Sequence, residues 1–453
     1  MADNSLALRT VTAARCQLAG GFLLSLALLA YSLCFLLGQG PEKYLFVVIQ
    51  VLLLMNLLSG GYRKVFNSLG PLGLISLPAA LILLHNFLLD PPTDSGYIHN
   101  LIGFATLVLS VVLVTQIISP VLRVRLSRVI SCMAGLVVVI HFTQIMLAKL
   151  LAWRTLAIYG GLFSNPHYLA NSALLTLPIL LNSAFQSSIS VQRRIFFGLA
   201  GLDIVLLLET GSRPAWLGFL GGFLIASFFI AKGKYKLLIP LVAVVILTFL
   251  YNTDIGILRA RVDDLVATIA TEERITIWGD TIKMLENNTN AAWVIGNGIG
   301  SYEHVFDDYT SIDRYRIFIF PHNFLLEITF ASGLLGLALV ASAYTLFFLK
   351  CLQRIRHSLD RKNQLLTGSL LAGFIMHFIH AFLTFPFYSK LTLYPEAVFF
   401  GLALTHISHQ NDRPSFDLCS HKKLSSLGNS TCIPRDQKTP CENKSLRDHL
   451  TFW

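Results

Sequence analysis

The sequence predicts an all-α polytopic membrane protein with about 12 transmembrane helices and one large periplasmic loop. Of its 453 residues, 54% are hydrophobic and only 13% are charged, and the mean hydropathy is +0.63. Long runs contain no Asp, Glu, Lys or Arg: residues 16–41, 65–89, 95–122, 129–148 and 155–192. A helix needs ~20 apolar residues to cross a bilayer, so each run is long enough. The leucine, glycine and proline content favours helices over the short alternating strands of a barrel.

The apolar segments predict the spans in chain order. We expect them at residues 18–37, 43–59, 69–89, 98–119, 129–150, 165–185, 195–209, 214–231, 236–251, 321–349, 364–384 and 391–408. The first follows Arg9 and Arg15 as a signal peptide would, but it is longer and more spans follow at once, so we expect it to be retained. Residues 1–251 thus hold spans one to nine, and residues 321–409 hold spans ten to twelve. The polar tail, 410–453, is rich in Ser and Lys and is expected to be disordered.

Lysine and arginine in the short connections predict the orientation. One set of connections is basic: Arg63, Lys64, Arg123, Arg125, Arg128, Arg193, Arg194, Lys232, Lys234, Lys236, Lys350, Arg354, Arg356, Arg361 and Lys362. The alternate set is nearly bare, as at residues 90–100. Both termini are therefore expected in the cytoplasm. The net charge of +10 reflects this bias, so membrane lipids are expected partners and nucleic acid is not.

The one long connection, residues 252–320, is expected outside the cytoplasm, where long loops are often functional. Apolar residues recur at helical spacing in its first part, which predicts an amphipathic helix: Leu258, Val262, Leu265, Val266 and Ile269. A second helical piece carries Arg274 and Trp278 on one face. VIGNGIGSY, residues 294–302, is expected to be a flexible turn, because no strand–turn–helix unit makes it a dinucleotide site. Pro321 is then expected in the first turn of span ten.

Three residues near the outer mouth of the bundle are candidates for chemistry. Arg213, in a short outer hairpin, either reaches lipid headgroups or grips phosphate oxygens with its guanidinium fork. Arg274 either grips phosphate oxygens in the same way or is simply a charge on the surface. His322 is either an interfacial packing residue or a general base, since imidazole titrates near neutral pH.

Other polar residues leave their roles open. Glu327, just over one turn below His322, either orients that histidine or neutralises an arginine. Acids inside a membrane are functional candidates, yet Asp203 is expected to be a hydrogen-bonding packing residue. His377 and His380 have no acidic partner in sequence and are expected to pack. The tail cysteines lack zinc-site spacing, and no Walker A loop, HExxH, GxSxG or DxD pair is present, so no metal or cofactor site is expected.

Several segments together resemble the O-antigen ligase and polymerase superfamily. His322 and Asn323 are followed, after nine residues, by Gly333-Leu334-Leu335-Gly336, similar to that family's histidine and Gly-x-x-Gly pattern. ERITIWGDTIKML and VIGNGIGSYEHVF resemble the segment before the histidine, and TGSRPAWLGF resembles a family hairpin. GGLFSNPHYLANSALLTLPIL resembles a family span, with His167 where Asn is commoner. The motifs cover roughly residues 150–350 and keep the family's order.

The resemblance implies a GT-C-like, metal-independent, inverting glycosyltransferase of the bacterial inner membrane. Such an enzyme moves a glycan from undecaprenyl diphosphate to a sugar hydroxyl of lipid A–core on the periplasmic face. Arg213 and Arg274 would lie by the diphosphate, and His322 would be the essential histidine. Asn323 and Glu327 would join the arginines in binding substrate. No cofactor is implied, and cationic forks suit a developing diphosphate charge without one.

Three enzymes share these motifs, and a different class competes with them. The single large loop favours a ligase over a polymerase, which tends to have two comparable loops. The short tail disfavours a protein O-oligosaccharyltransferase. A transporter or flippase would have a similar number of spans, but the asymmetric loops show no pair of similar halves.

Overall fold

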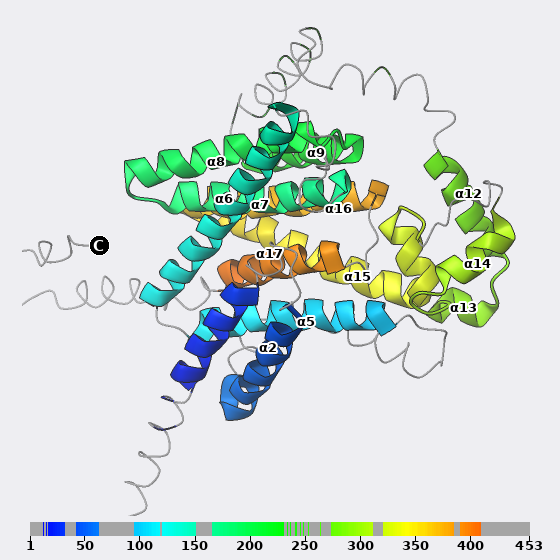
Figure 1. Ribbon diagram of the computed structural model, residues 1–453, viewed down its shortest axis with the longest axis horizontal. Coiled ribbons are helices and arrows are strands. Elements are labelled where there is room, and N and C mark those ends of the chain that lie inside the picture. The colour runs from blue at the N-terminus through cyan, green and yellow to red at the C-terminus, as the bar shows by residue number, and fades with distance from the viewer. Residues whose placement is uncertain are drawn as a thin grey trace, which may run out of the picture. The chain divides into compact units, whose positions relative to one another are not determined.

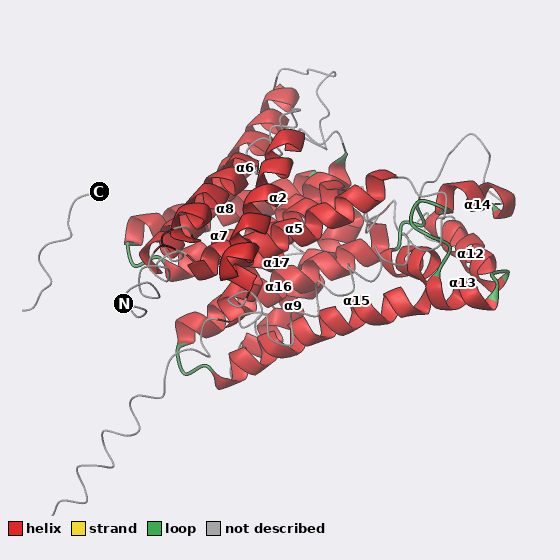
Figure 2. Ribbon diagram, turned by 90° about the horizontal axis from the view of Figure 1, so that it is seen from below, coloured by secondary structure: helices red, strands yellow, loops and turns green. Residues whose placement is uncertain are grey.

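The computed structural model describes residues 12, 15, 17–31, 42–62, 95–117, 120–150, 165–230, 273–310, 320–384 and 390–408, with isolated residues between 233 and 263. Across these residues the regular structure is helical, and no strand occurs (Figures 1 and 2). The all-α class predicted from composition is therefore confirmed for this part of the chain.

Helices follow the apolar segments. A helix over Gln17–Tyr31 is followed by α2 (Glu42–Asn56), a π-helical turn (Leu57–Gly61), α5 (Ser95–Ile117), α6 (Pro120–Leu150), α7 (Pro166–Gln186), α8 (Ser190–Glu209), α9 (Arg213–Ile230), α12 (Glu273–Glu286), α13 (Asn290–Ile295), α14 (Tyr302–Tyr309), α15 (Phe324–His357), α16 (Arg361–Thr384) and α17 (Lys390–Ser408).

Five of the described helices are long and apolar enough to cross a membrane. Their apolar segments are Asn100–Ile117, Leu126–Leu150, Pro166–Gln186, Phe324–His357 and Arg361–Thr384. Shorter apolar helices occupy Gln17–Tyr31, Tyr44–Gly60, Arg213–Phe229 and Leu393–Ile407. The predicted spans at 69–89 and 236–251, and the amphipathic helix expected from residue 258, lie almost wholly outside the described residues. The chain is thus polytopic, while a total of twelve spans stays a prediction.

The core is built by α16, which packs along α9, α7 and α15, while α17 packs on α5 and α7 on α8. The contact of α9 with α16 is close because Gly218 and Gly222 lie on one face of α9. A Cβ on Gly222 would meet the backbone nitrogen of Met376 at 2.8 Å, and one on Gly218 would meet its oxygen at 2.6 Å. Small residues four apart let membrane helices approach to backbone contact. This contact fixes the start of α9, which carries Arg213, against α16.

Helix α15 contains a break at Gly333. The glycine-rich turn that precedes the helix in sequence is hydrogen-bonded to the backbone of α15 beside this break. Gly333 has φ 64° and ψ −170°, a conformation open only to glycine. The break turns later N–H groups away from the carbonyls of Phe330 and Ala331. Asn297 N and Gly298 N donate to those two oxygens instead, at 2.8 and 3.0 Å. The turn that was expected to be flexible is therefore docked on α15, through backbone contact that leaves no room for a Cβ on Gly333.

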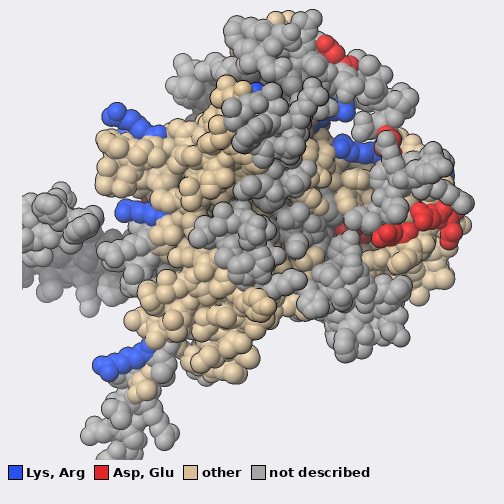
Figure 3. Space-filling view, viewed as in Figure 1, with Lys and Arg blue, Asp and Glu red and all other residues tan. Residues whose placement is uncertain are grey.

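Charges separate along the bundle. On the face in Figure 3, most of the red carboxylates gather over α12–α14, and several blue side chains project from the opposite end of the helices. Helices α12, α13 and α14 pack against the first part of α15. One end of the bundle therefore carries helices α12–α14, which belong to the predicted loop of residues 252–320. Basic connections between helices lie at the opposite end.

Candidate functional site at one end of the helix bundle

His322 lies just before α15 in a strained conformation. Its φ of 55° is the one positive value among the described non-glycine residues, and such values are costly and cluster at functional sites. Asn323 caps the helix, since its Oδ1 accepts from Leu325 N at 3.0 Å and Leu326 N at 3.2 Å. The prediction that Pro321 occupies the first turn is wrong: proline precedes the cap, and the helix begins at Phe324.

The ring of His322 is oriented by α16. Its Nδ1 lies 3.3 Å from the backbone oxygen of Thr384, and the ring of Phe320 packs with its centroid 4.5 Å away. A carbonyl oxygen can only accept a hydrogen bond, so the proton of the neutral imidazole is placed on Nδ1. In this tautomer Nε2 carries the lone pair, so it is the nitrogen that can act as a base.

Electrostatics keep His322 neutral. The pKa of His322 is lowered from 6.5 to about 4, mainly by burial and also by the charge of Arg274. The hydrogen bond to Thr384 and the charge of Glu273 act in the opposite direction. Burial disfavours the charged imidazolium because the ion loses its hydration. At neutral pH the residue is an unprotonated base.

Arg274 reaches the same place from α12. Its charge acts on His322 and also on His380 of α16. Four residues further along α12, Trp278 packs on Phe382 of α16 with ring centroids 6.2 Å apart. The predicted shared face of Arg274 and Trp278 is thus the face that meets α16.

The hairpin before Arg213 is tied to α7. Gly211 makes the turn with a φ of 64°, and Ser212 Oγ shares a hydrogen bond of 2.9 Å with His167 Nδ1. His167 stands in the first turn of α7, where Asn165 Oδ1 accepts from its backbone N–H at 2.8 Å. Arg213, half-buried, opens α9 directly after Ser212.

His380 joins the two halves of the site. Its ring centroid lies 6.4 Å from that of His167, and it interacts electrostatically with Arg274. It lies one turn before Thr384, whose carbonyl holds His322. The structure therefore gathers His322 and Arg274 at one side of His380, with His167 and the Ser212–Arg213 hairpin at the other.

A buried polar pair lies behind His380. His377 Nδ1 is 2.9 Å from Asn171 Oδ1, and His377 Nε2 is 3.1 Å from Glu396 Oε1. An amide oxygen only accepts, so Nδ1 carries a proton, and the contact of Nε2 with Glu396 requires one more proton shared by the two groups. His377 is buried, as expected of a packing residue, and α17 gives it an acidic partner that no local spacing in the sequence indicated.

The remaining predicted residues take varied places. Glu327 is buried. Burial raises the pKa of Tyr302, the charges of Asp280 and Glu327 raise it further, and the hydrogen bond that Tyr302 shares with Thr281 opposes them. The carboxylate that acts on His322 is Glu273. Asp203 Oδ2 accepts from Thr176 Oγ1 at 2.7 Å, which confirms its packing role between α8 and α7. Glu209 pairs with Lys149.

Sequence reasoning missed His167, Ser212 and His380 as members of this cluster. His167 was marked only as a departure from the commoner asparagine, and Ser212 only as part of a hairpin. His380 carried no local signal, since its neighbours come from distant segments. Within the part of the chain that the structure describes, no group of three or more His, Cys, Asp or Glu could hold a metal ion.

The fold and the cluster define a polytopic helical membrane protein with a cationic, histidine-containing site at one end of its bundle. A family model described as O-antigen ligase matches residues 196–341. Residues 196–341 are therefore similar to the O-antigen ligase family, and the resemblance to that superfamily is confirmed over this range. No curated protein matches the chain. The matched range includes Arg213, Arg274 and His322, whereas His167 and His380 lie outside it. The match supports a membrane enzyme of the ligase or polymerase type.

Proposed function

We propose that this protein is an O-antigen ligase, which transfers a glycan from undecaprenyl diphosphate to a sugar hydroxyl of lipid A–core. The observation that carries the proposal is the meeting of Arg274 and a neutral His322 at the end of α16. A base and a cation side by side suit a reaction that removes a proton and releases a diphosphate.

In the proposed reaction the acceptor hydroxyl attacks the anomeric carbon of the donor sugar. The hydroxyl proton passes to His322 Nε2, because the carbonyl of Thr384 holds the proton of the neutral ring on Nδ1. The bond from the anomeric carbon to the diphosphate oxygen breaks, and the electron pair leaves with the diphosphate. Attack opposite the leaving group inverts the anomeric configuration.

Arg213 and Arg274 are assigned to the diphosphate. Their guanidinium forks can each take two phosphate oxygens and offset the charge that develops as the bond breaks. Ser212 and His167 would set the position of Arg213 through the hairpin, and the close α9–α16 contact would set its distance from Arg274. In this proposal Asn323 and Glu327 shape the substrate side of the site, which faces the periplasm of an inner-membrane protein.

The test is a lipopolysaccharide gel from cells lacking the protein, with lipid-linked glycan extracted in parallel. We expect core without attached glycan and full-length polymer accumulating on undecaprenyl diphosphate. Core capped by a single repeat unit would instead identify a polymerase, and an unchanged gel would contradict both.

Complementation then tests the site. We expect His322→Ala to restore no glycan attachment although it reaches the membrane at the normal level. His304→Ala is the matched control, because His304 lies exposed on α14 and should restore attachment. Normal attachment by His322→Ala would remove the base from the proposed mechanism.

A further inference from the structure

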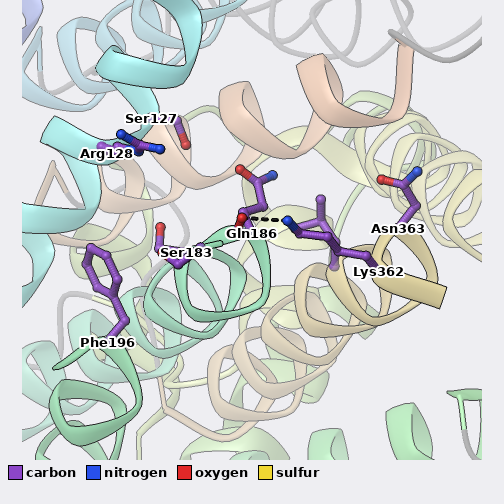
Figure 4. A pocket seen from close by; sticks show the side chains of 9 residues that line it. Ser127, Arg128, Ser183, Gln186, Phe196, Lys362 and Asn363 are labelled. Atoms are coloured by element: carbon purple, nitrogen blue, oxygen red, sulfur yellow. Dashed lines mark hydrogen bonds between the residues drawn. The ribbon is translucent and has the colours of Figure 1, made fainter. Parts of the chain in front are cut away.

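A second polar cavity lies at the other end of the bundle. It has a volume of about 300 Å³ and is lined from α6, α7, α8 and α16 (Figure 4). Helix α7 places His167 in its first turn and Gln186 at its end, and α16 begins beside the cavity and ends at Thr384. At 1.5 Å per residue, α7 is about 30 Å long. The cavity is therefore about one membrane thickness from the candidate site and cannot belong to it.

Its lining is cationic and rich in hydrogen-bond donors. Arg128 comes from α6 and Lys362 from α16, and no carboxylate lines the cavity. Ser183 and Gln186 lie between the two cations in Figure 4. The hydroxyls of Ser127 and Ser187 and the side-chain amides of Gln186 and Asn363 can donate to an anion. Ser183 does not add a donor, because Ser131 donates to the backbone oxygen of Ser127 and Ser183 therefore donates to Ser131.

The nearby contacts leave donors available. Lys362 Nζ donates to the backbone oxygen of Gln186 at 2.5 Å, which uses one of the three protons of an ammonium. Asp360 Oδ1 accepts from the backbone nitrogen of Lys362 at 2.9 Å, but Asp360 does not line the cavity. Arg128 is exposed to the cavity side of α6 and presents its fork there.

The depth matches that of lipid headgroups. Arg128 lies two residues into the apolar stretch that begins at Leu126, and Lys362 is the second residue of α16. Phe196 and Leu366 add apolar surface to the lining. Basic pockets between membrane helices bind the headgroups of anionic lipids, and this volume is at the lower end of ligand pockets.

We propose that this cavity binds a phosphate group, carried by the headgroup of an anionic phospholipid in the leaflet at this end of the bundle. Two cations that face one shared space repel each other, and a phosphodiester between them replaces that repulsion with attraction. The guanidinium fork of Arg128 would donate to two phosphate oxygens. The ammonium group of Lys362, which acts as a point charge, would make a third contact with the phosphate. Free phosphate has the same chemistry, so the source must be tested.

Binding is measured on the purified full-length protein in neutral detergent by native mass spectrometry, apart from any glycan transfer. Phosphatidylglycerol is titrated against phosphatidylcholine, with inorganic phosphate as competitor. The variants are Arg128→Gln and Lys362→Gln. Arg193→Gln is the matched control, because Arg193 is an exposed arginine in the first turn of α8 at the same end and does not line the cavity.

We expect tighter binding of phosphatidylglycerol than of phosphatidylcholine, weakened about fivefold or more in each cavity variant and unchanged in Arg193→Gln. If inorganic phosphate at low millimolar concentration displaces the lipid, the cavity is a phosphate site, but its ligand is the free ion and not a lipid headgroup. Equal binding of both lipids without phosphate competition, or equal weakening by Arg193→Gln, would overturn the proposal. Lys362→Gln could unfold the protein, because Lys362 also donates to the backbone oxygen of Gln186 at the end of α7. In that case Arg128→Gln alone decides the outcome.

Discussion

At the scale of single residues, the arginine that opens α9 is expected to act through the shape of its side chain. Lysine keeps the charge of Arg213 but offers no planar fork for two phosphate oxygens. We expect Arg213→Lys to lower transfer by about 10-fold or more, measured as the rate of glycan attachment in membranes. Full activity in the lysine variant would reduce the role of Arg213 to that of a counter-charge.

The neutral state of His322 predicts the pH dependence of transfer. Because its pKa is lowered from 6.5 to about 4, the free enzyme should keep its base well below the ordinary titration of histidine. The acid limb of kcat/KM, which reports the free enzyme, is expected near pH 4. An acid limb near pH 6.5 in the unaltered enzyme would contradict this assignment.

The same shift affects stability with a definite sign. The unfolded chain binds the proton at a higher pH than the folded chain, so this residue's contribution is full above pH 6.5. That contribution falls as the pH drops from 6.5 towards 4.

The buried pair of His377 and Glu396 predicts a difference between two substitutions. Glu396→Ala leaves His377 Nε2 buried without its partner, and loss of one member of a buried pair costs about 3–5 kcal/mol. Glu396→Gln can still donate a hydrogen bond to Nε2 and should cost about 1–2 kcal/mol. Unfolding of the purified protein measures both, and equal losses would contradict the shared-proton pair.

The site was only partly predictable at this scale. Arg213, Arg274 and His322 could be selected because each lies in a short segment with a recognisable pattern at a predicted end of the helices. His377 could not be paired, because Asn171 is 206 residues away and no local spacing reports such a contact. His380 was missed for the same reason.

At the scale of elements, the break in α15 predicts a large effect from one methyl group. A Cβ on Gly333 would meet the backbone of Val294 and Ile295 and would be strained at φ 64°. We expect Gly333→Ala to destabilise the protein by about 1–3 kcal/mol and to lower transfer, since it displaces the turn docked beside the site. Thermal unfolding measures the change.

Gly279→Ala provides the matched control for that change. Gly279 lies inside α12, and a Cβ there meets nothing within 4 Å. Alanine in a helix interior is favoured over glycine by about 1 kcal/mol, so this variant should be neutral or stabilised. If both variants behave alike, the docked turn does not depend on Gly333.

The helices themselves were predictable and their internal details were not. Apolar segments with few charges mark helices because a charge inside a bilayer is costly, and α5, α7 and α16 follow the predicted spans 98–119, 165–185 and 364–384 within a few residues. The π-helical turn after α2 and the break at Gly333 arise from contacts between segments. Glycine alone does not tell a break from a close helix contact such as that of Gly222.

At the scale of the whole molecule, the candidate site and the basic cavity lie at opposite ends of the same helices. With cysteine-free protein as background, Asn290→Cys on α13 and Leu359→Cys between α15 and α16 should label from opposite sides, and both positions are exposed. We expect an impermeant thiol reagent to label Asn290→Cys in cells with a permeabilised outer membrane. Leu359→Cys should label only after lysis. The reverse pattern would place the site in the cytoplasm.

The site also depends on the order in which the chain is made. His167 and Arg213 enter the membrane early, Arg274 and His322 follow, and the carbonyl that orients His322 belongs to Thr384, the last residue of α16. Glu396, the partner of His377, comes later still. A chain growing from its N-terminus therefore holds Arg213 and Arg274, the two arginines that the proposal assigns to the diphosphate, before it holds an oriented base. Under the proposed mechanism, a polypeptide stalled before α16 would bind donor lipid without consuming it, so activity would begin only after α16 has folded.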